Sequence, residues 1–188
     1  MPNKDIRARV QLIGLALVCV FGTTIAQAAN KLPTGDPCTI VPLDAVQKAF
    51  PGAQAGVRRP EVEKYGLTQC FWSRGKGDVL FGVAESYTTD ATVMDDAQVE
   101  ASGYLDRSMP AARRGARFEP IAGLGVDAVA FIETKDPKRG IVADAAFVVL
   151  RKGQRTVTLA IPSPQGIDRA ATLKLFETLG RIAAIRLE

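Results

Sequence analysis

The chain has 188 residues, a formal net charge of +4 at pH 7, and no histidine. The absence of histidine excludes Ser-His-Asp and Cys-His catalytic arrangements, histidine metal ligands and a histidine pH switch. The net charge is small and the basic residues are scattered, so the composition argues against nucleic-acid binding.

The first 28 residues have the features of a signal peptide. A basic segment ending at Arg9 precedes an apolar run from Leu12 to Phe21, and Ala26-Gln27-Ala28 supplies the small residues that signal peptidase requires. The apolar run is shorter than the roughly 20 residues needed to span a membrane. We therefore expect cleavage after Ala28 and export of residues 29–188 to the periplasm, as a single soluble domain without a membrane anchor.

The cysteines predict one disulfide and no lipid anchor. Cys19 lies inside the apolar run, and the residue before it is Val18, where a lipidation motif has Gly, Ala or Ser. Cleavage leaves Cys38 and Cys70, and an even number of cysteines in an oxidising compartment indicates a disulfide; two buried free thiols are the alternative. Because alternate strand residues share a face, we expect Trp72 to pack beside Cys70, with ligand stacking as the alternative role.

Hydrophobic periodicity predicts an α+β fold: a mainly antiparallel sheet of about five to six strands with three helices packed on it. The expected helices lie near residues 42–50, 90–108 and 165–185. Strand patterns cover residues 67–74, 79–87, 118–121, 126–133, 141–152 and 154–161, and residues 56–66 are expected to form an exposed loop or edge strand. Several of these strand segments are joined by short glycine-containing turns, which connect antiparallel neighbours, whereas parallel pairs need long crossovers.

Apolar spacing also predicts which helix faces are buried. In the first helix the buried stripe is expected at Leu43, Val46 and Phe50. In the last helix it is expected at Ala171, Leu175, Leu179 and Ile182, with Phe176 and Ala183 beside it.

Two patterns that suggest chemistry carry little weight. Gly123 to Ala128 matches the dinucleotide-binding pattern G-x-G-x-x-[GA], but a strand rather than a helix is expected to follow it. We interpret it as a glycine turn, and no cofactor or metal is predicted. The possible partners in a hydrolytic carboxylate pair are Glu63, Glu85, Glu119, Asp127, Glu133 and Asp144, and their spacing singles out no two of them. Asp144 is unusual because it lies in an otherwise apolar segment.

Four motifs recur in the same order in a known group of proteins. They are D-P-C-x-I-x-P-x-x-A-V at 36–46, Cys-Phe-Trp at 70–72, G-L-G-x-x-A at 123–128 and V-V-L-R-K-G at 148–153, followed by a C-terminal helix. The chain resembles a bacterial family of exported domains of unknown function, many of them lipoproteins, that open with D-P-C-x-L. The resemblance implies a PsbP-like α+β fold and no catalytic residues. Val41 departs from the family's usual threonine cap, and the missing lipidation cysteine implies a soluble rather than a tethered protein.

We expect a non-catalytic binding or accessory protein of the cell envelope. The candidate partner-binding residues are Arg113, Arg114 and Arg117, which lie on a connection between a helix and a strand. Arginine binds carboxylate and phosphate groups in a forked geometry, so the expected partner is an anionic envelope component or a periplasmic protein. The alternative role of these arginines is solubility. The alternative functions are a carboxylate-pair hydrolase of envelope polymers and a periplasmic inhibitor of a lytic enzyme.

Overall fold

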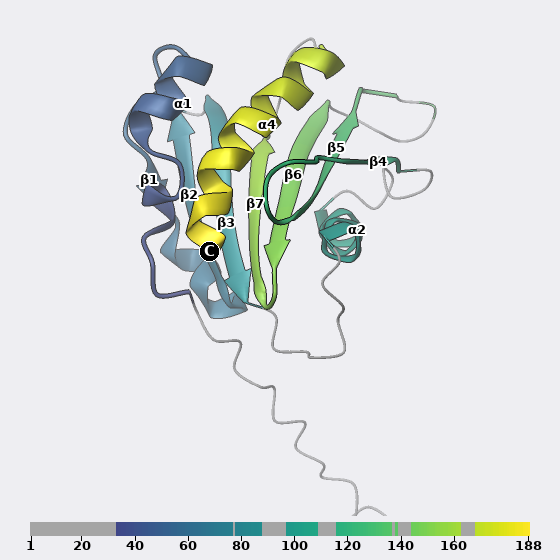
Figure 1. Cartoon of the computed structure of the whole chain (residues 1–188). Helices are drawn as coiled ribbons and strands as arrows, with labels where there is room; N and C mark the ends of the chain where they lie inside the picture. The colour runs from purple at the N-terminus through teal and green to yellow at the C-terminus, as the bar shows by residue number, and fades with distance from the viewer. Residues whose placement is uncertain are drawn as a thin grey trace, which may run out of the picture.

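The structure is a computed structural model that describes residues 33–76, 78–87, 97–108, 116–136, 138, 144–162 and 168–188. Its strands form one sheet in the order β1-β2-β3-β7-β6-β5-β4, and every neighbouring pair is antiparallel (Figure 1). The strands are β1 (Val57–Arg58), β2 (Leu67–Ser73), β3 (Val79–Tyr87), β4 (Phe118–Pro120), β5 (Asp127–Glu133), β6 (Ala145–Lys152) and β7 (Arg155–Ile161). The longer helices are α1 (Leu43–Ala49), α2 (Ala97–Ser108) and α4 (Arg169–Ala184), and short 3-10 helices are η2 (Pro37–Thr39), η3 (Pro60–Tyr65) and η5 (Ile185–Leu187).

The predicted α+β class and antiparallel sheet are confirmed, but the predicted strand count is wrong. The described sheet has seven strands instead of five or six. The additional strand is β1, which forms in the segment expected to be a loop or edge strand. It consists of two residues, too few to show an alternating pattern. The predicted signal peptide and residues 90–96 and 165–167 of the predicted helices lie outside the described residues.

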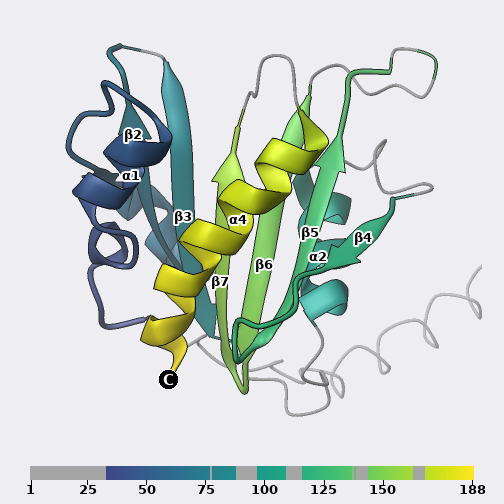
Figure 2. The ribbon, with the colours of Figure 1, turned by 45° about the horizontal axis from the view of Figure 1, so that its top comes forward.

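Helices lie on both faces of the sheet. Figure 2 shows α1 and α4 on the near face and α2 on the far face. The near face, which we call the α4 face, holds the larger core, with Trp72, Phe81 and Phe176 among its fully buried residues. The far face, which we call the α2 face, holds a smaller core in which α2 packs on β5 and β6.

Helix α4 is capped at its N-terminus by Asp168, whose carboxylate accepts a hydrogen bond from the Ala171 backbone N–H at 3.0 Å. The buried residues of this helix are Thr172, Phe176, Leu179, Gly180, Ala183 and Ala184. Leu179, Phe176 and Ala183 are buried as predicted. The rest of the predicted stripe is wrong by about one residue around the helix, because Ala171 is exposed and Leu175 and Ile182 are only half-buried. Helix α1 differs in a similar way: Leu43 is exposed, and Val41 before the helix is buried instead.

The predicted Cys38–Cys70 disulfide is present and joins the η2 segment to β2. Trp72 is buried on the same face of β2 as Cys70, as predicted. Gly56 lies against both residues, since a Cβ atom added there would lie 2.5 Å from Cys70 Sγ and 2.9 Å from Trp72 Cε2. The backbone therefore approaches the disulfide and the indole as closely as glycine permits.

Replacing Gly56 with alanine is expected to lower the free energy of unfolding by about 1–3 kcal/mol, the usual cost of overpacking. Both neighbouring groups are buried, so neither can move away freely. Urea denaturation measures the effect. The matched control is Gly35→Ala, where a Cβ would meet nothing within 4 Å. Equal unfolding midpoints for the two variants would show that the site relaxes without cost.

Candidate functional site

A row of cross-strand neighbours runs across the α2 face of the sheet, and the size of their side chains varies along the row. From β1 to β4 its members are Val57, Phe71, Gly82, Ala160, Phe147, Phe131 and Phe118. Successive ring centroids lie 6.0 Å apart between Phe118 and Phe131 and 5.2 Å apart between Phe131 and Phe147. Between Phe147 and Phe71 the row holds only an alanine and a glycine, so the surface is hollowed over β7 and β3.

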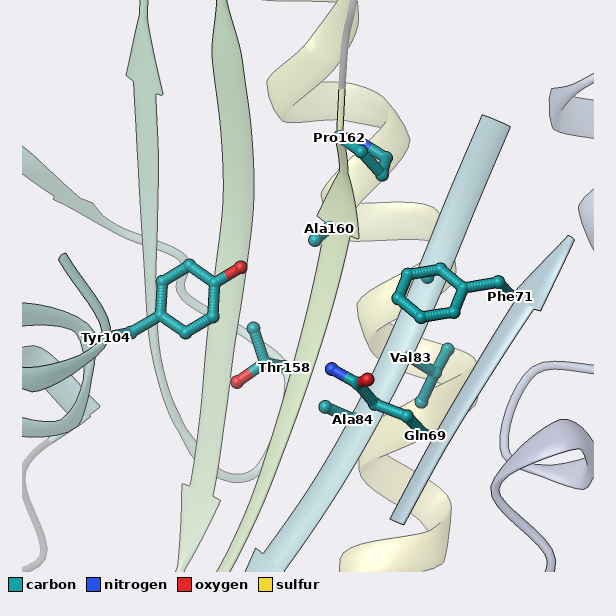
Figure 3. Close-up of a pocket in the computed structure, with 9 residues that line it drawn as sticks. Gln69, Phe71, Val83, Ala84, Tyr104, Thr158, Ala160 and Pro162 are labelled. Carbon is teal, nitrogen blue, oxygen red and sulfur yellow. The ribbon is translucent and has the colours of Figure 1, made fainter. Parts of the chain in front are cut away.

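This hollow continues toward α2. One part, of about 170 Å³, lies over β2, β3 and β7, and a second part, of about 180 Å³, lies over β6 and β7. Both parts are lined by Tyr104, Ala160 and Pro162, and together we call them the trough. Figure 3 shows Tyr104 and Phe71 on opposite sides of the trough, with Thr158 and Gln69 between them.

The walls of the trough are held by packing. The Tyr104 ring lies 4.8 Å from the Phe147 ring, measured between centroids. On the other side, the Phe71 ring covers the backbone of Gly82, where an added Cβ would lie 2.6 Å from Phe71 Cε1. Glycine at this position therefore allows the ring to lie directly on β3, and Ala84 and Ala160 keep the floor low.

The polar groups of the trough are neutral. Gln69 and Thr158 are half-buried, and neither side chain makes a hydrogen bond within the described part of the chain. None of the described lining residues is Asp, Glu, Lys or Arg.

At the rim, the Arg59 guanidinium lies 5.6 Å from the centroid of the Phe71 ring and forms an ion pair with Glu61. The pKa of Glu61 is lowered, first by a hydrogen bond from its own backbone and then by Arg59. The rim pair joins one guanidinium to one carboxylate, so its formal charges cancel.

Helix α2 is fixed firmly to the sheet, which sets the position of Tyr104. Arg151 on β6 has a fully buried guanidinium, and its Nη1 atom lies 2.7 Å from Glu100 Oε1 on α2. Asp127 on β5 accepts a hydrogen bond from the Ala97 backbone N–H at 2.6 Å, which satisfies a donor in the first turn of the helix. Three apolar residues of α2 complete the contact, all fully buried: Ala97, Ala101 and Leu105.

The arginines predicted from the sequence do not line the trough. Arg117 is exposed and immediately precedes β4, at the opposite edge of the sheet from β1 and β2. Arg113 and Arg114 lie outside the described residues, so their role stays a prediction. None of the trough residues was predicted as part of a site. The available signal was the half-exposed side of β7, where Thr158 and Ala160 alternate with buried Val157 and Leu159.

The carboxylates proposed for a hydrolytic pair have separate structural roles. Glu85 is buried on the α4 face and bound by Arg155, with 2.6 Å between Nη2 and Oε1. Asp127 holds the start of α2. Asp144 precedes β6 instead of lying within it, and accepts a hydrogen bond from the Lys135 backbone N–H at 2.6 Å. The other three are Glu63, paired with Arg58, Glu119, paired with Arg169, and Glu133, at the end of β5.

In the described part of the chain, no group of three or more His, Cys, Asp or Glu side chains is placed to hold a metal ion. Among the helices in that part, none has the length and apolar character needed to cross a membrane.

Comparison with known proteins finds no matching family model, no similar curated protein and no similar solved structure. The resemblance to exported PsbP-like domains therefore stays a prediction.

Proposed function

We propose that the protein is an exported, non-catalytic binding domain of the cell envelope that holds a neutral group of its ligand in the trough. The observation that carries this proposal is the pairing of two aromatic walls with a floor of small residues. Concave sites with apolar walls and a few polar groups are typical of ligand binding in proteins. Here the polar groups include the Tyr104 hydroxyl and the side chains of Gln69 and Thr158, and the latter two have no hydrogen-bond partner among the described residues.

The positions of the acidic residues give no support to the alternative of a carboxylate-pair hydrolase. Such a mechanism needs two carboxyl groups that flank one bond of the substrate. Of the candidates, Glu85 and Glu119 lie on the α4 face and are paired with arginines, whereas Asp127 lies on the α2 face and holds α2. No observation favours an inhibitor of a lytic enzyme over a general binding role.

Removing one aromatic wall tests the proposal. The mature protein is mixed with envelope fragments from the producing bacterium and sedimented, and the bound fraction is measured. We expect Phe71→Ala to weaken binding about ten-fold, because an aromatic contact contributes about 0.5–1.5 kcal/mol beyond its buried area. The matched control is Tyr65→Ala, which removes an exposed ring on η3, outside the trough. Equal binding by the two variants would contradict the proposal.

The salt dependence of binding distinguishes a ligand held in the trough from one held by Arg113, Arg114 and Arg117. Exposed charges interact over about 10 Å at 0.1 M salt and about 3 Å at 1 M, whereas neutral contacts are not screened. Binding in the trough should therefore persist at high salt and in a triple variant with Arg113, Arg114 and Arg117 changed to glutamate. Retention that falls under both changes and resists Phe71→Ala would overturn the trough and place binding at the arginines.

A further inference from the structure

We infer that the ligand of the trough is a carbohydrate, held through neutral pyranose rings; this inference rests on the proposed function. A pyranose ring has a face of C–H groups that packs against aromatic rings and an edge of hydroxyl groups that require hydrogen bonds. The trough offers both kinds of partner. Phe71 and Tyr104 present aromatic rings. Gln69 and Thr158 lie between these rings, and each of the two side chains has both a hydrogen-bond donor and an acceptor.

The charge of the site selects against anionic ligands. A phosphate or carboxylate taken out of water needs a cation or several N–H donors. No described residue that lines the trough is Lys or Arg. On the rim, Arg59 is already paired with Glu61.

The topology selects against a peptide bound as an added strand. Main-chain pairing requires a strand with a free edge. The floor of the trough is formed by β3 and β7, which are both interior strands: β3 lies between β2 and β7, and β7 lies between β3 and β6.

The polar side chains in the trough disfavour an acyl chain as the ligand. It would cover the polar atoms of Gln69 and Thr158 and remove their water without replacing its hydrogen bonds, and such unpaired burial costs free energy.

The dimensions fit short sugar chains. Pockets for drug-sized ligands enclose about 300–1,000 Å³. The two parts of the trough measure about 170 and 180 Å³ and share Tyr104, Ala160 and Pro162. Each part is suited to a single ring, so two linked sugar residues would occupy the trough side by side, one on each side of Ala160.

Titration of the isotope-labelled mature protein, followed by amide chemical shifts, tests this inference. The probes are a linear tetramer of N-acetylglucosamine and a linear tetramer of glucose, which distinguish acetamido sugars from plain ones. We expect saturable shifts at the backbone amides of Gln69, Ala84, Thr158 and Ala160 and at the side-chain amide of Gln69. The variants Gln69→Ala and Thr158→Val should each weaken binding about ten-fold, the equivalent of about 1.4 kcal/mol.

Two controls match these variants in chemistry but lie outside the trough. Gln154→Ala removes an exposed amide in the β6–β7 turn, and Thr178→Val removes a hydroxyl on the exposed side of α4. Neither should change saccharide binding. Loss of binding in the controls to the same extent would overturn the assignment of the saccharide to the trough.

The remaining outcomes separate the inference from the proposed function. If neither tetramer shifts these amides while envelope binding still depends on Phe71, the carbohydrate inference is wrong and the proposed function stands. If dodecylphosphocholine below its micelle concentration, or an uncharged apolar peptide, shifts the same amides in place of the saccharides, the ligand class is a lipid or a peptide and the inference is overturned. If envelope binding is also insensitive to Phe71→Ala, both proposals fail.

Discussion

Replacing Cys38 and Cys70 together with alanine should lower the free energy of unfolding by about 2–5 kcal/mol. The two cysteines are separated by 32 positions, and closing a loop of that length restricts the unfolded chain by an amount worth about 3–4 kcal/mol in the chain-entropy description. The bond also ties the η2 segment to β2, where Cys70 is fully buried. Urea denaturation monitored by Trp72 fluorescence measures the change.

Reduced wild-type protein is the control for this experiment. It loses the covalent link but keeps both sulfur atoms, so it separates the effect of the link from the effect of the smaller alanine side chains. We expect the reduced protein to lose most of the stability that the double variant loses. Labelling of both thiols by an alkylating reagent in the folded, unreduced protein would contradict the disulfide itself.

Replacing Glu100 with alanine should destabilise the protein by about 3 kcal/mol. The change removes the Glu100 carboxylate, whose Oε1 atom lies 2.7 Å from Nη1 of the buried Arg151 guanidinium, and truncating one member of a buried ion pair costs about 3–5 kcal/mol. The Glu100 side chain is 24% exposed, which places the effect at the low end of that range. Thermal and urea unfolding measure it, with Glu177→Ala on the exposed side of α4 as the matched control.

A double variant, Glu100→Leu with Arg151→Met, tests the cause. Replacing both members of a buried ion pair with apolar residues is often neutral or stabilising. The double variant should therefore recover most of the stability that Glu100→Ala loses. If the double variant is as unstable as Glu100→Ala, the loss arises from packing rather than from the broken ion pair. Because α2 carries Tyr104, Glu100→Ala should also weaken ligand binding in the trough.

Local patterns were sufficient to predict the type and approximate position of most elements. The apolar segment that became β6 is buried on both faces, and the glycines at 123 and 125 have φ of +77° and +74° in the turn before β5. The disulfide and the burial of Trp72 also followed from spacing and from the expected compartment. These features could be predicted because they depend on residue types and on residues close together in the sequence, and a single sequence gives both.

The sequence-based predictions are wrong where tertiary contacts determine which residues are buried and which strands become neighbours. Helix α4 has apolar residues around more than half of its circumference, so the sequence allows two adjacent stripes, and contact with the sheet selects the one centred on Phe176 and Ala183. The close approach at Gly180, whose added Cβ would lie 3.2 Å from Leu124 Cδ1, belongs to that choice. The trough has the same origin. Phe71, Gly82 and Ala160 become neighbours only through the order β2-β3-β7, which no local pattern specifies.

The pairing of β3 with β7 makes the sheet a union of two halves, one from β1 to β3 and the other from β4 to β7. The trough lies across this seam, with Phe71 and Gly82 on one side and Thr158 and Ala160 on the other. The ion pair between buried Glu85 on β3 and half-buried Arg155 on β7 joins the halves on the opposite face. Neither half alone contains the complete floor of the trough. Strands β3 and β7 are distant in sequence, so their pairing has an entropic cost that local hairpins avoid. Under the proposed function, the ligand would bind only when the halves have joined, and its retention would then report completed folding.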